Sequence, residues 1–348
     1  MSEQLLQQQT NEPFTAQADR ASTSSFMKKA LFLVNPVAGR MLIKRYLAEV
    51  LNIFTQSGYL TTVYMTQRAG DATRMIAEHG SEYEAIFCSG GDGTLNEAIT
   101  GMQQARLDLP LGYIPCGSTN VFADCVGLSS QPLKAARDIV SGSERLVDIA
   151  SFNGYYFSYI SAIGLFSSLS YTVPQSMKNA IGHAAYVLSA VQDLSKVRPM
   201  HLRITGSGDF LTPGTGSGKN KRATTAFTDH REGTLIDGDY LFAAISNCDT
   251  IASAFPLDKH LVDLNDGQFE FLLIQYPSSP LEMEEILAAL ASKSYTSCKY
   301  LQFFRFSQCE IFTDFTEPWS LDGEMGMGEP PVTVQVLHNG LRLLTSAK

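Results

Sequence analysis

The stretch AIFCSGGDGTLNE, residues 85–97, decides the fold that we expect for this chain. An apolar strand leads into three glycines, and a helix follows them. Glycine has no Cβ atom, so backbone N–H groups there can approach phosphate oxygens closely, and a helix N-terminus favours anions. Asp92 lies between the glycines, where a carboxylate would repel phosphate unless magnesium lay between them. The stretch therefore predicts a magnesium-dependent nucleotide loop, with Thr94 as a hydroxyl donor and with Asn96 and Glu97 as caps of the helix.

Strands and helices alternate on both sides of this loop. Short apolar or β-branched segments are expected to be strands, and segments with apolar residues at helical spacing are expected to be helices. The expected strands are residues 30–34, 61–65, 85–88 and 111–114, and the expected helices are residues 43–58, 71–79, 97–102 and 120–126. Because the connections are short, this alternation predicts a parallel, doubly wound α/β sheet.

Two other turns follow strands in the same way as the glycine loop. NPVAGR, residues 35–40, follows the first strand and ends in Arg40, a cation suited to phosphate. IPCGSTN, residues 114–120, follows the fourth strand. Ligands of doubly wound sheets bind at the carboxyl ends of the strands. Three such loops in one sheet therefore predict one nucleotide site.

The pattern changes beyond about residue 142. Aromatic and aliphatic residues alternate in short runs that turn residues separate, as in 155–160, 240–245, 269–275 and 303–306. This pattern predicts a β-rich, mainly antiparallel sandwich domain. We expect a disordered tail at 1–25, a nucleotide-binding domain at 26–146 together with about 326–348, and an acceptor-binding β-rich domain at 147–325, with a mobile insertion at about 206–233.

Composition excludes some classes of protein. The formal charge of −9 argues against a nucleic-acid binder, which needs a basic face to meet phosphates. No apolar run approaches the roughly 20 residues that span a bilayer. The six cysteines form no CxxC pair, which disfavours zinc and predicts buried, reduced thiols in a cytoplasmic protein.

The three loops together carry a resemblance. NPVAG, GGDGTLNE and IPCGSTN, in that order, resemble the diacylglycerol kinase catalytic domain family, whose close bacterial members are soluble lipid kinases and whose distant members include sphingosine kinases. The similarity extends from about Ala30 to Leu344. It includes VDI at 147–149, KNAIG at 178–182, NDG at 265–267 and LDGE at 321–324.

The resemblance implies which residues contact the nucleotide. They come from all three loops, from the end of the second strand, and from one basic residue expected near the phosphates. The implied contacts are Asn35, Pro36, Val37, Ala38, Gly39, Arg40, Thr66, Gly90, Gly91, Gly93, Thr94, Leu95, Asn96, Glu97, Ser118 and Lys178.

The resemblance also implies the catalytic and metal-binding residues. Glu324 would be the general base, with help from Asp92, which organises the active-site magnesium. A structural magnesium site would use the carboxylate of Asp266 and the backbone carbonyls of Asp263 and Gln268. The family usually has Asp at position 121, in one network with Asp92 and Asp148. This chain has Val121, which puts the rate or the usual acceptor in doubt.

These features predict an ATP- and Mg²⁺-dependent kinase that phosphorylates a lipid hydroxyl, with diacylglycerol as the leading acceptor and phosphatidate as the product. We expect a cytoplasmic protein that is peripheral to the inner face of the membrane, with no transmembrane segment, no nucleic-acid partner and a possible homodimer. One alternative is a kinase of another acceptor, such as a sphingoid base, undecaprenol or a small alcohol. Another is a weakly active ATP-binding regulatory protein, and NAD kinase is a third.

Overall fold

The computed structural model describes residues 27–164, 198–211, 224–226, 234–248, 250–251, 255–256, 262–292, 297–314, 318–326 and 329–346. The predictions of a tail at 1–25 and of a nucleotide contact at Lys178 lie outside these residues. The predicted insertion at 206–233 lies partly outside them too. Within it, the structure describes the end of strand β8 (Met200–Leu211) and strand β9 (Thr224–Ala226).

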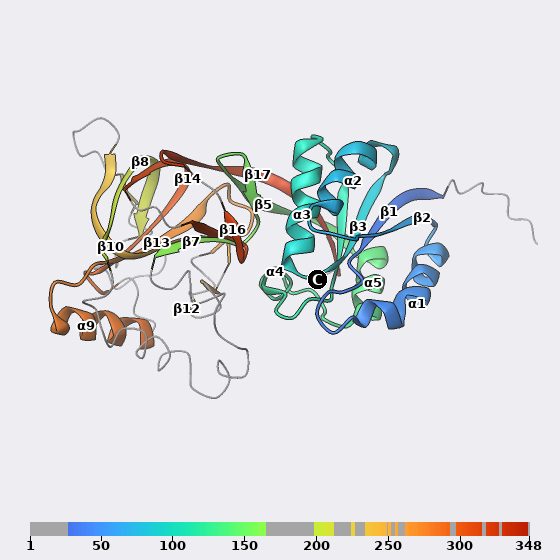
Figure 1. The fold of residues 1–348 in the computed structure, drawn as a ribbon, viewed down its shortest axis with the longest axis horizontal. Helices are drawn as coiled ribbons and strands as arrows, with labels where there is room; N and C mark the ends of the chain where they lie inside the picture. Colours follow the sequence, from blue (N-terminus) through green and yellow to red (C-terminus); the bar gives the residue numbers. More distant parts are fainter. Residues whose placement is uncertain are drawn as a thin grey trace, which may run out of the picture.

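The N-terminal domain contains a parallel sheet with strand order β2-β1-β3-β4 (Figure 1). Strands and helices alternate along the chain, as the sequence predicts. The elements are β1 (Lys28–Val34), α1 (Leu42–Gln56), β2 (Tyr59–Met65), α2 (Asp71–His79), the 3-10 turn η1 (Gly80–Glu82), β3 (Ala85–Gly90), α3 (Asp92–Gln104), β4 (Pro110–Pro115), α4 (Val121–Val126) and α5 (Pro132–Ser141).

Both faces of this sheet are covered, which explains why its strands are continuously apolar. Side chains of a strand alternate between faces. Along β1, Leu31 and Leu33 belong to the cluster that includes residues of α2 and α3. Phe32 and Val34 belong to the cluster that includes residues of α1 and α5. Helices therefore cover both faces of the parallel sheet.

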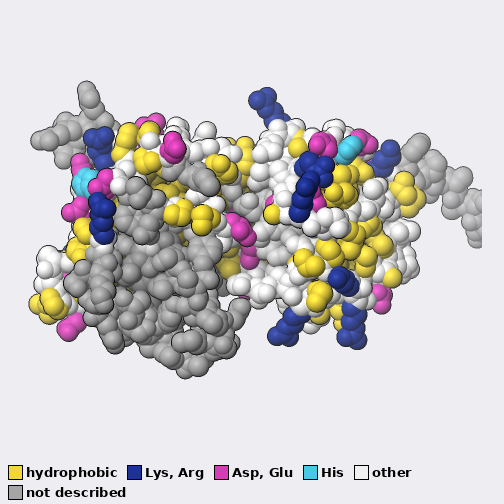
Figure 2. Space-filling model, viewed as in Figure 1, with side chains coloured by type: hydrophobic (Ala, Val, Ile, Leu, Met, Phe, Trp, Pro, Cys, Tyr) yellow, Lys and Arg dark blue, Asp and Glu magenta, His cyan; other side chains and the backbone are white. Residues whose placement is uncertain are grey.

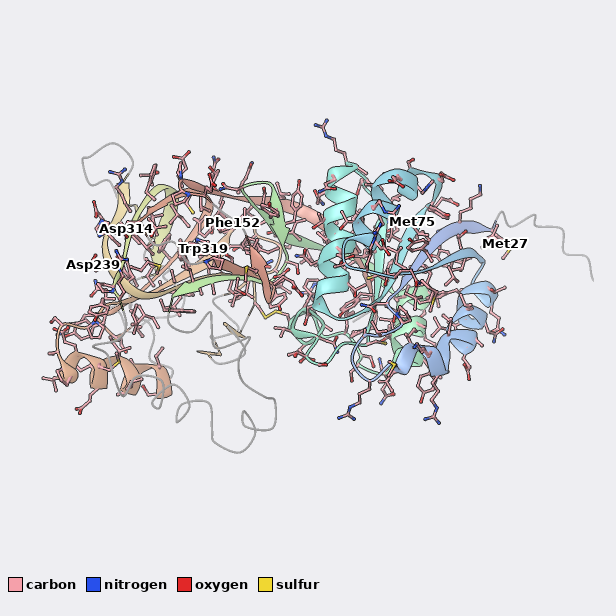
Figure 3. The ribbon with its side chains drawn as sticks, in the orientation of Figure 1. Met27, Met75, Phe152, Asp239, Asp314 and Trp319 are labelled. Carbon is pink, nitrogen blue, oxygen red and sulfur yellow. A yellow bond between two sulfur atoms is a disulfide. The ribbon has the colours of Figure 1, made fainter. Side chains whose placement is uncertain are left out.

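The C-terminal domain is rich in strands, as expected. Its elements are β5 (Ser143–Phe152), β6 (Tyr155–Phe157), β7 (Ile160–Gly164), β8, β9, β10 (Thr234–Ser246), β11 (Thr250–Ile251), β12 (Phe255–Pro256), β13 (Phe269–Gln275), α9 (Pro280–Ala291), β14 (Leu301–Thr313), β15 (Trp319–Leu321), β16 (Glu324–Gly326) and β17 (Val332–Thr345). Its core contains large aromatic side chains, such as Phe152 against Trp319 with ring centroids 5.2 Å apart (Figure 3).

The hydrogen bonding of this domain differs from the expected sandwich of two separate sheets. Strand β8 pairs with both β10 and β14, and β13 also pairs with both of them, so these four strands form a ring. Strand β17 continues the network into the N-terminal domain, because it pairs with β14 and β5 and then, in parallel, with β4. Among the described strands, only β11 and β12 stand outside this single network.

The expectation of reduced thiols is wrong for two cysteines. Cys125 in α4 and Cys248 after β10 form a disulfide between residues that are 123 positions apart. Cys88, Cys116, Cys298 and Cys309 are free, as predicted. No described helix is long and apolar enough to cross a membrane.

Candidate active site

Three loops meet at the carboxyl ends of β1, β3 and β4, and glycines form their contacts. A Cβ atom at Gly39 would lie 2.4 Å from the carbonyl oxygen of Cys116, and one at Gly117 would lie 2.4 Å from the Cα atom of Gly91. Gly39 also has a φ of 49°, in the left-handed region that favours glycine. The absence of side chains therefore lets the three backbones touch.

Asn35 connects the first loop to the second. Its Nδ2 atom donates to Thr94 Oγ1 at 3.0 Å, and its Oδ1 atom accepts from the backbone N–H of Val37 at 3.1 Å. The side chain of Thr94 lies over Gly90, where a Cβ atom would be 2.3 Å from Thr94 Oγ1. The buried hydroxyl of Thr94 therefore holds the first two loops together.

A cavity of about 490 Å³ opens above these loops. Its lining confirms that most of the predicted nucleotide residues lie together. The predicted residues that line it are Asn35, Pro36, Val37, Ala38, Gly39, Thr66, Gly91, Gly93, Thr94, Glu97, Ser118 and Glu324. Gln67, Arg68, Ala69 and Gly117 also line it, and the sequence reasoning missed them. The first three follow β2, so the rule of strand ends could have found them.

Some residues predicted near the nucleotide have other roles. Leu95 is buried in the hydrophobic core. Asn96 and Glu97 do not cap α3, because that helix begins at Asp92. Glu97 instead accepts N–H groups at the start of α2, at 2.8 and 3.1 Å, so it joins two helices. Asn96 donates from Nδ2 to the carbonyl of Tyr156 at 2.8 Å and therefore joins α3 to the second domain.

Gly117→Ala tests whether the contact between the loops supports nucleotide binding. The new methyl group would lie 2.4 Å from Gly91 Cα, so the loops must move apart. We expect the Kd for ATP to rise about tenfold, since overpacking of this kind costs about 1–3 kcal/mol. Isothermal titration calorimetry measures it. Gly238→Ala is the control, because its methyl group would meet nothing closer than 3.5 Å. An unchanged Kd for Gly117→Ala would contradict the expectation.

Glu324 reaches the glycine loop from the second domain. A Cβ atom at Gly93 would lie only 2.9 Å from Glu324 Oε1, so the carboxylate lies directly against the loop. Asp322 and Gly323, with φ of 50° and 87°, form the two-residue turn between β15 and β16. Two positive φ values are typical of the hairpin turns that Asp-Gly favours. Figure 2 shows acidic side chains at the surface where the two domains meet.

Asp322 holds this turn, and the sequence reasoning gave it no role. Its buried carboxylate accepts the N–H groups of Ser158, Tyr159 and Ile160 at 2.7 to 3.0 Å, and Ser158 Oγ at 2.9 Å. Asn96 Nδ2 donates to it as well, at 3.2 Å. Burial raises the pKa of Asp322, which these donors oppose. Asp322 is therefore a positioning residue for Glu324.

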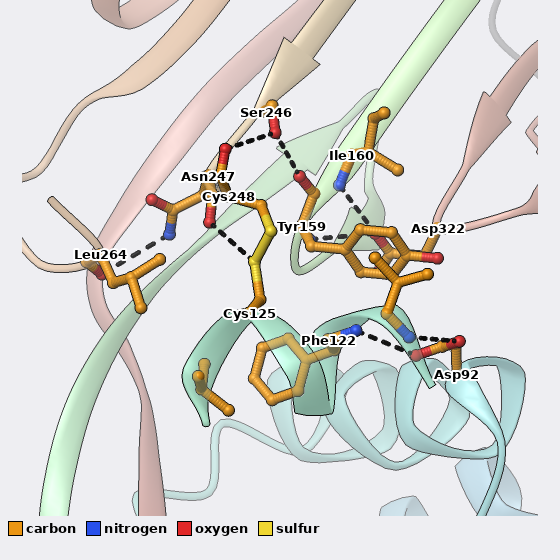
Figure 4. The surroundings of a disulfide bond; sticks show 12 residues. Asp92, Phe122, Cys125, Tyr159, Ile160, Ser246, Asn247, Cys248, Leu264 and Asp322 are labelled. Atoms are coloured by element: carbon orange, nitrogen blue, oxygen red, sulfur yellow. Dashed lines mark hydrogen bonds between the residues drawn. A yellow bond between two sulfur atoms is a disulfide. The ribbon is translucent and has the colours of Figure 1, made fainter. Parts of the chain in front are cut away.

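Asp92 is held by the start of α4. Its carboxylate accepts the backbone N–H groups of Val121 at 3.0 Å and Phe122 at 3.2 Å (Figure 4). Burial raises the pKa of Asp92 to about 6, and Asp322 adds to the rise, whereas the two amides lower it. Position 121 therefore contacts Asp92 through its backbone, which Val supplies as well as Asp would.

Asp92 fits a magnesium ion bound together with a nucleotide. Mg²⁺ typically uses one or two carboxylates, substrate phosphates and water. Each Asp92 oxygen accepts one of these two amides and keeps a further lone pair for a cation. Asp322 fits less well as a ligand, because both of its oxygens already accept N–H donors.

Asp148 lies at a different place from the predicted one. Its buried carboxylate accepts N–H groups from Gly267 at 2.6 Å and Asn339 at 2.7 Å, and His338 Nδ1 lies 2.9 Å away. These partners join the turn before β13 to β17. Asp148 therefore stabilises that turn, and the structure does not bring it together with Asp92.

The predicted metal residues Asp263, Asp266 and Gln268 lie in this same turn. Asp266 Oδ1 accepts the N–H of Gln268 at 3.0 Å, and Asp266 Oδ2 pairs with the buried Arg305 at 3.1 Å. Burial raises the pKa of Glu270, across from Arg305, well above its usual range, and Asp266 is the carboxylate whose oxygen lies within ion-pair distance of the guanidinium. In the described turn, the guanidinium of Arg305 supplies the positive charge beside Asp266. The metal ion at this turn remains a prediction.

Asp266→Asn is expected to lower the free energy of unfolding by about 3 kcal/mol, because it leaves a buried guanidinium without its partner. Urea unfolding measures it, with and without magnesium. Asp314→Asn is the control, since Asp314 is exposed (Figure 3). A loss that appears only with magnesium present would assign the effect to a metal and contradict the role of Arg305.

The cavity lies at the carboxyl ends of parallel strands, where doubly wound sheets bind ligands such as phosphates. A carboxylate from the second domain faces it, and this combination is typical of two-domain phosphotransferases. The comparisons agree. A family model for the diacylglycerol kinase catalytic domain matches residues 29–152. A diacylglycerol kinase of Staphylococcus epidermidis is 35% identical over 324 residues, which cover 91% of this chain and 92% of that protein. One of Bacillus subtilis (strain 168) is 29% identical over 304 residues, which cover 86% and 91%.

Solved structures show the same fold. A crystal structure from Bacillus anthracis, described as that of a putative diacylglycerol kinase, superimposes with a TM-score of 0.71 at 20% identity, over 94% of this chain and 98% of that chain. Another from the same organism gives 0.66 at 18% identity, over 91% and 97%. The chain belongs to the diacylglycerol kinase family.

Proposed function

We propose that the protein transfers the γ-phosphoryl group of ATP to the hydroxyl group of diacylglycerol, giving ADP and phosphatidate. One observation carries the proposal: the carboxylate of Glu324, from the second domain, lies against Gly93 of the phosphate loop. Phosphoryl transfer needs a phosphate site, charge neutralisation and a base near the acceptor hydroxyl. The loops and Glu324 lie around one cavity and can supply the first and the last of these.

The three glycine-containing loops would bind the triphosphate through backbone N–H groups. Asp92 would hold a magnesium ion between itself and the phosphates, and the ion would neutralise charge that develops during transfer. Arg68, which lines the cavity with a largely exposed side chain, can add a positive charge at its edge.

Glu324 would accept the proton of the acceptor hydroxyl. A general base must lie within hydrogen-bond reach of that proton, and Glu324 lies at the mouth of the phosphate loop. Hydrogen bonds to Asp322 fix the turn and so limit how far Glu324 can move. A base that is already positioned loses less entropy on reaching the reactive geometry.

Diacylglycerol is the leading acceptor because the curated relatives that cover most of this chain are named diacylglycerol kinases. In this proposal, residues 26–146 together with about 326–348 bind nucleotide, and residues 147–325 bind the acceptor. The lipid would be met at a membrane surface, with the protein peripheral to it.

Transfer of labelled γ-phosphate from ATP to lipids in mixed micelles tests the proposal. The panel contains diacylglycerol, sphingosine, undecaprenol and no lipid, each with and without magnesium. We expect label on diacylglycerol only when magnesium is present. Label on another lipid would retain the reaction and change the acceptor. Binding of ATP without any labelled lipid would favour the regulatory alternative.

A further inference from the structure

The disulfide joins the two domains beside the candidate active site. Cys125 lies in α4 of the N-terminal domain, and Cys248 follows β10 of the C-terminal domain (Figure 4). Their Cα atoms are 5.7 Å apart, within the range that a disulfide requires. Because the residues are 123 positions apart, the bond connects two segments that are distant in the sequence.

On one side, the disulfide is connected to Asp92. Helix α4 has six residues, from Val121 to Val126, so a shift at Cys125 moves both of its ends. The first N–H groups of this helix hold the Asp92 carboxylate. A shift of α4 would therefore reach the carboxylate of the proposed magnesium ligand through these two hydrogen bonds.

On the other side, the disulfide is connected to Glu324. Ser246 Oγ and the N–H of Asn247, next to Cys248, both donate to the carbonyl of Tyr159 at 3.0 Å. The N–H of Tyr159 in turn donates to Asp322, at 3.0 Å. Asp322 forms the turn that carries Glu324. The disulfide thus connects the supports of both active-site carboxylates across the domain boundary.

We propose that Cys125 and Cys248 are a redox modification site that sets the freedom of the two domains to move apart. The disulfide holds α4 against the end of β10. In the dithiol form, the domains can separate for entry of the lipid and release of the product. The effect of reduction on turnover rests on the proposed function, whereas its effect on the mobility of α4 does not.

The chemistry is thiol–disulfide exchange with a small disulfide such as oxidised glutathione. A Cys125 thiolate attacks the small disulfide and releases one thiol, and Cys248 then displaces the second thiol. Two protein thiols lose two electrons and two protons, and one disulfide becomes two thiols. Cys125 is partly exposed and Cys248 is 2% exposed, so exchange starts at Cys125. The three buried thiols compete poorly, because burial raises the pKa of Cys88, Cys116 and Cys309.

The test compares protein treated with oxidised glutathione and protein treated with dithiothreitol. Peptide mapping after alkylation reports the bond, amide hydrogen exchange reports the freedom of α4, and lipid phosphorylation reports kcat. We expect a linked Cys125–Cys248 peptide only after oxidation, slower exchange in α4 in that form, and a kcat at least about threefold higher after reduction. Cys125→Ser should remove all three differences, and Cys298→Ser, at a free and partly exposed cysteine, should retain them.

The outcomes separate the two proposals. If no linked peptide forms, or if exchange in α4 and kcat are the same in both forms, the redox site is refuted. If neither form phosphorylates a lipid but reduction still speeds exchange in α4, the proposed function fails and the modification site stands.

Discussion

Asp92→Asn is expected to lower kcat about 10³-fold, in the range found when one electrostatic contact to a transition state is removed. The carboxylate is half-buried between the glycine loop and the two amides of α4, where its negative charge would bind a magnesium ion beside the phosphates. Asn keeps an oxygen for one of these amides but loses the charge. The effect should therefore fall on turnover and on magnesium dependence, with little change in folding.

Steady-state kinetics at saturating ATP, with a magnesium titration, measures this prediction. Asp124→Asn is the matched control, because Asp124 is an exposed carboxylate in the same helix α4. The melting temperature of both variants reports folding. Wild-type turnover in Asp92→Asn would remove the central element of the mechanism.

Glu324→Gln is expected to lower kcat about 10²-fold and to leave the Kd for ATP unchanged, because it removes a general base while keeping the size of the side chain. The carboxylate lies against Gly93 and contributes to the lining of the cavity from the second domain. The loops that would bind the phosphates come from the first domain and keep their contacts in this variant.

Single-turnover phosphorylation of diacylglycerol and calorimetric binding of ATP separate the two effects. Glu329→Gln is the control, since Glu329 is exposed and five residues away. Weaker binding of ATP with an unchanged rate of transfer would mean that Glu324 contacts the nucleotide and is not the base.

The sequence predicted the features that depend on local chemistry. Strand, glycine turn and helix in residues 85–97 fix the position of the glycine loop, and two similar turns follow other parallel strands. Their meeting at one edge follows from the parallel sheet alone. Glu324 was identified through the family resemblance, since no local pattern distinguishes it from an ordinary surface carboxylate.

The missed features depend on contacts between distant residues. Asp322 binds N–H groups more than 160 positions away, and the two linked cysteines are 123 positions apart. Asn96 and Glu97 were predicted to be helix caps because they follow the glycines. In the structure, Glu97 accepts a hydrogen bond at the start of α2, and Asn96 donates one to the carbonyl of Tyr156 in the second domain. The absence of an Asp side chain at position 121 raised a doubt about activity. In the structure, Asp92 accepts a hydrogen bond from the backbone N–H of Val121, and every residue except proline provides such a donor.

Strand β17 has a consequence for the order in which the protein can fold during synthesis. Arg342, Leu343 and Leu344 pair with β4 and complete the sheet of the nucleotide half, although that half is otherwise translated first. Domains usually fold as units while the ribosome extends the chain. Here the first half must wait, with one sheet edge open, until the last strand emerges. A premature stop before Arg342 would therefore harm the half of the protein that had already been made.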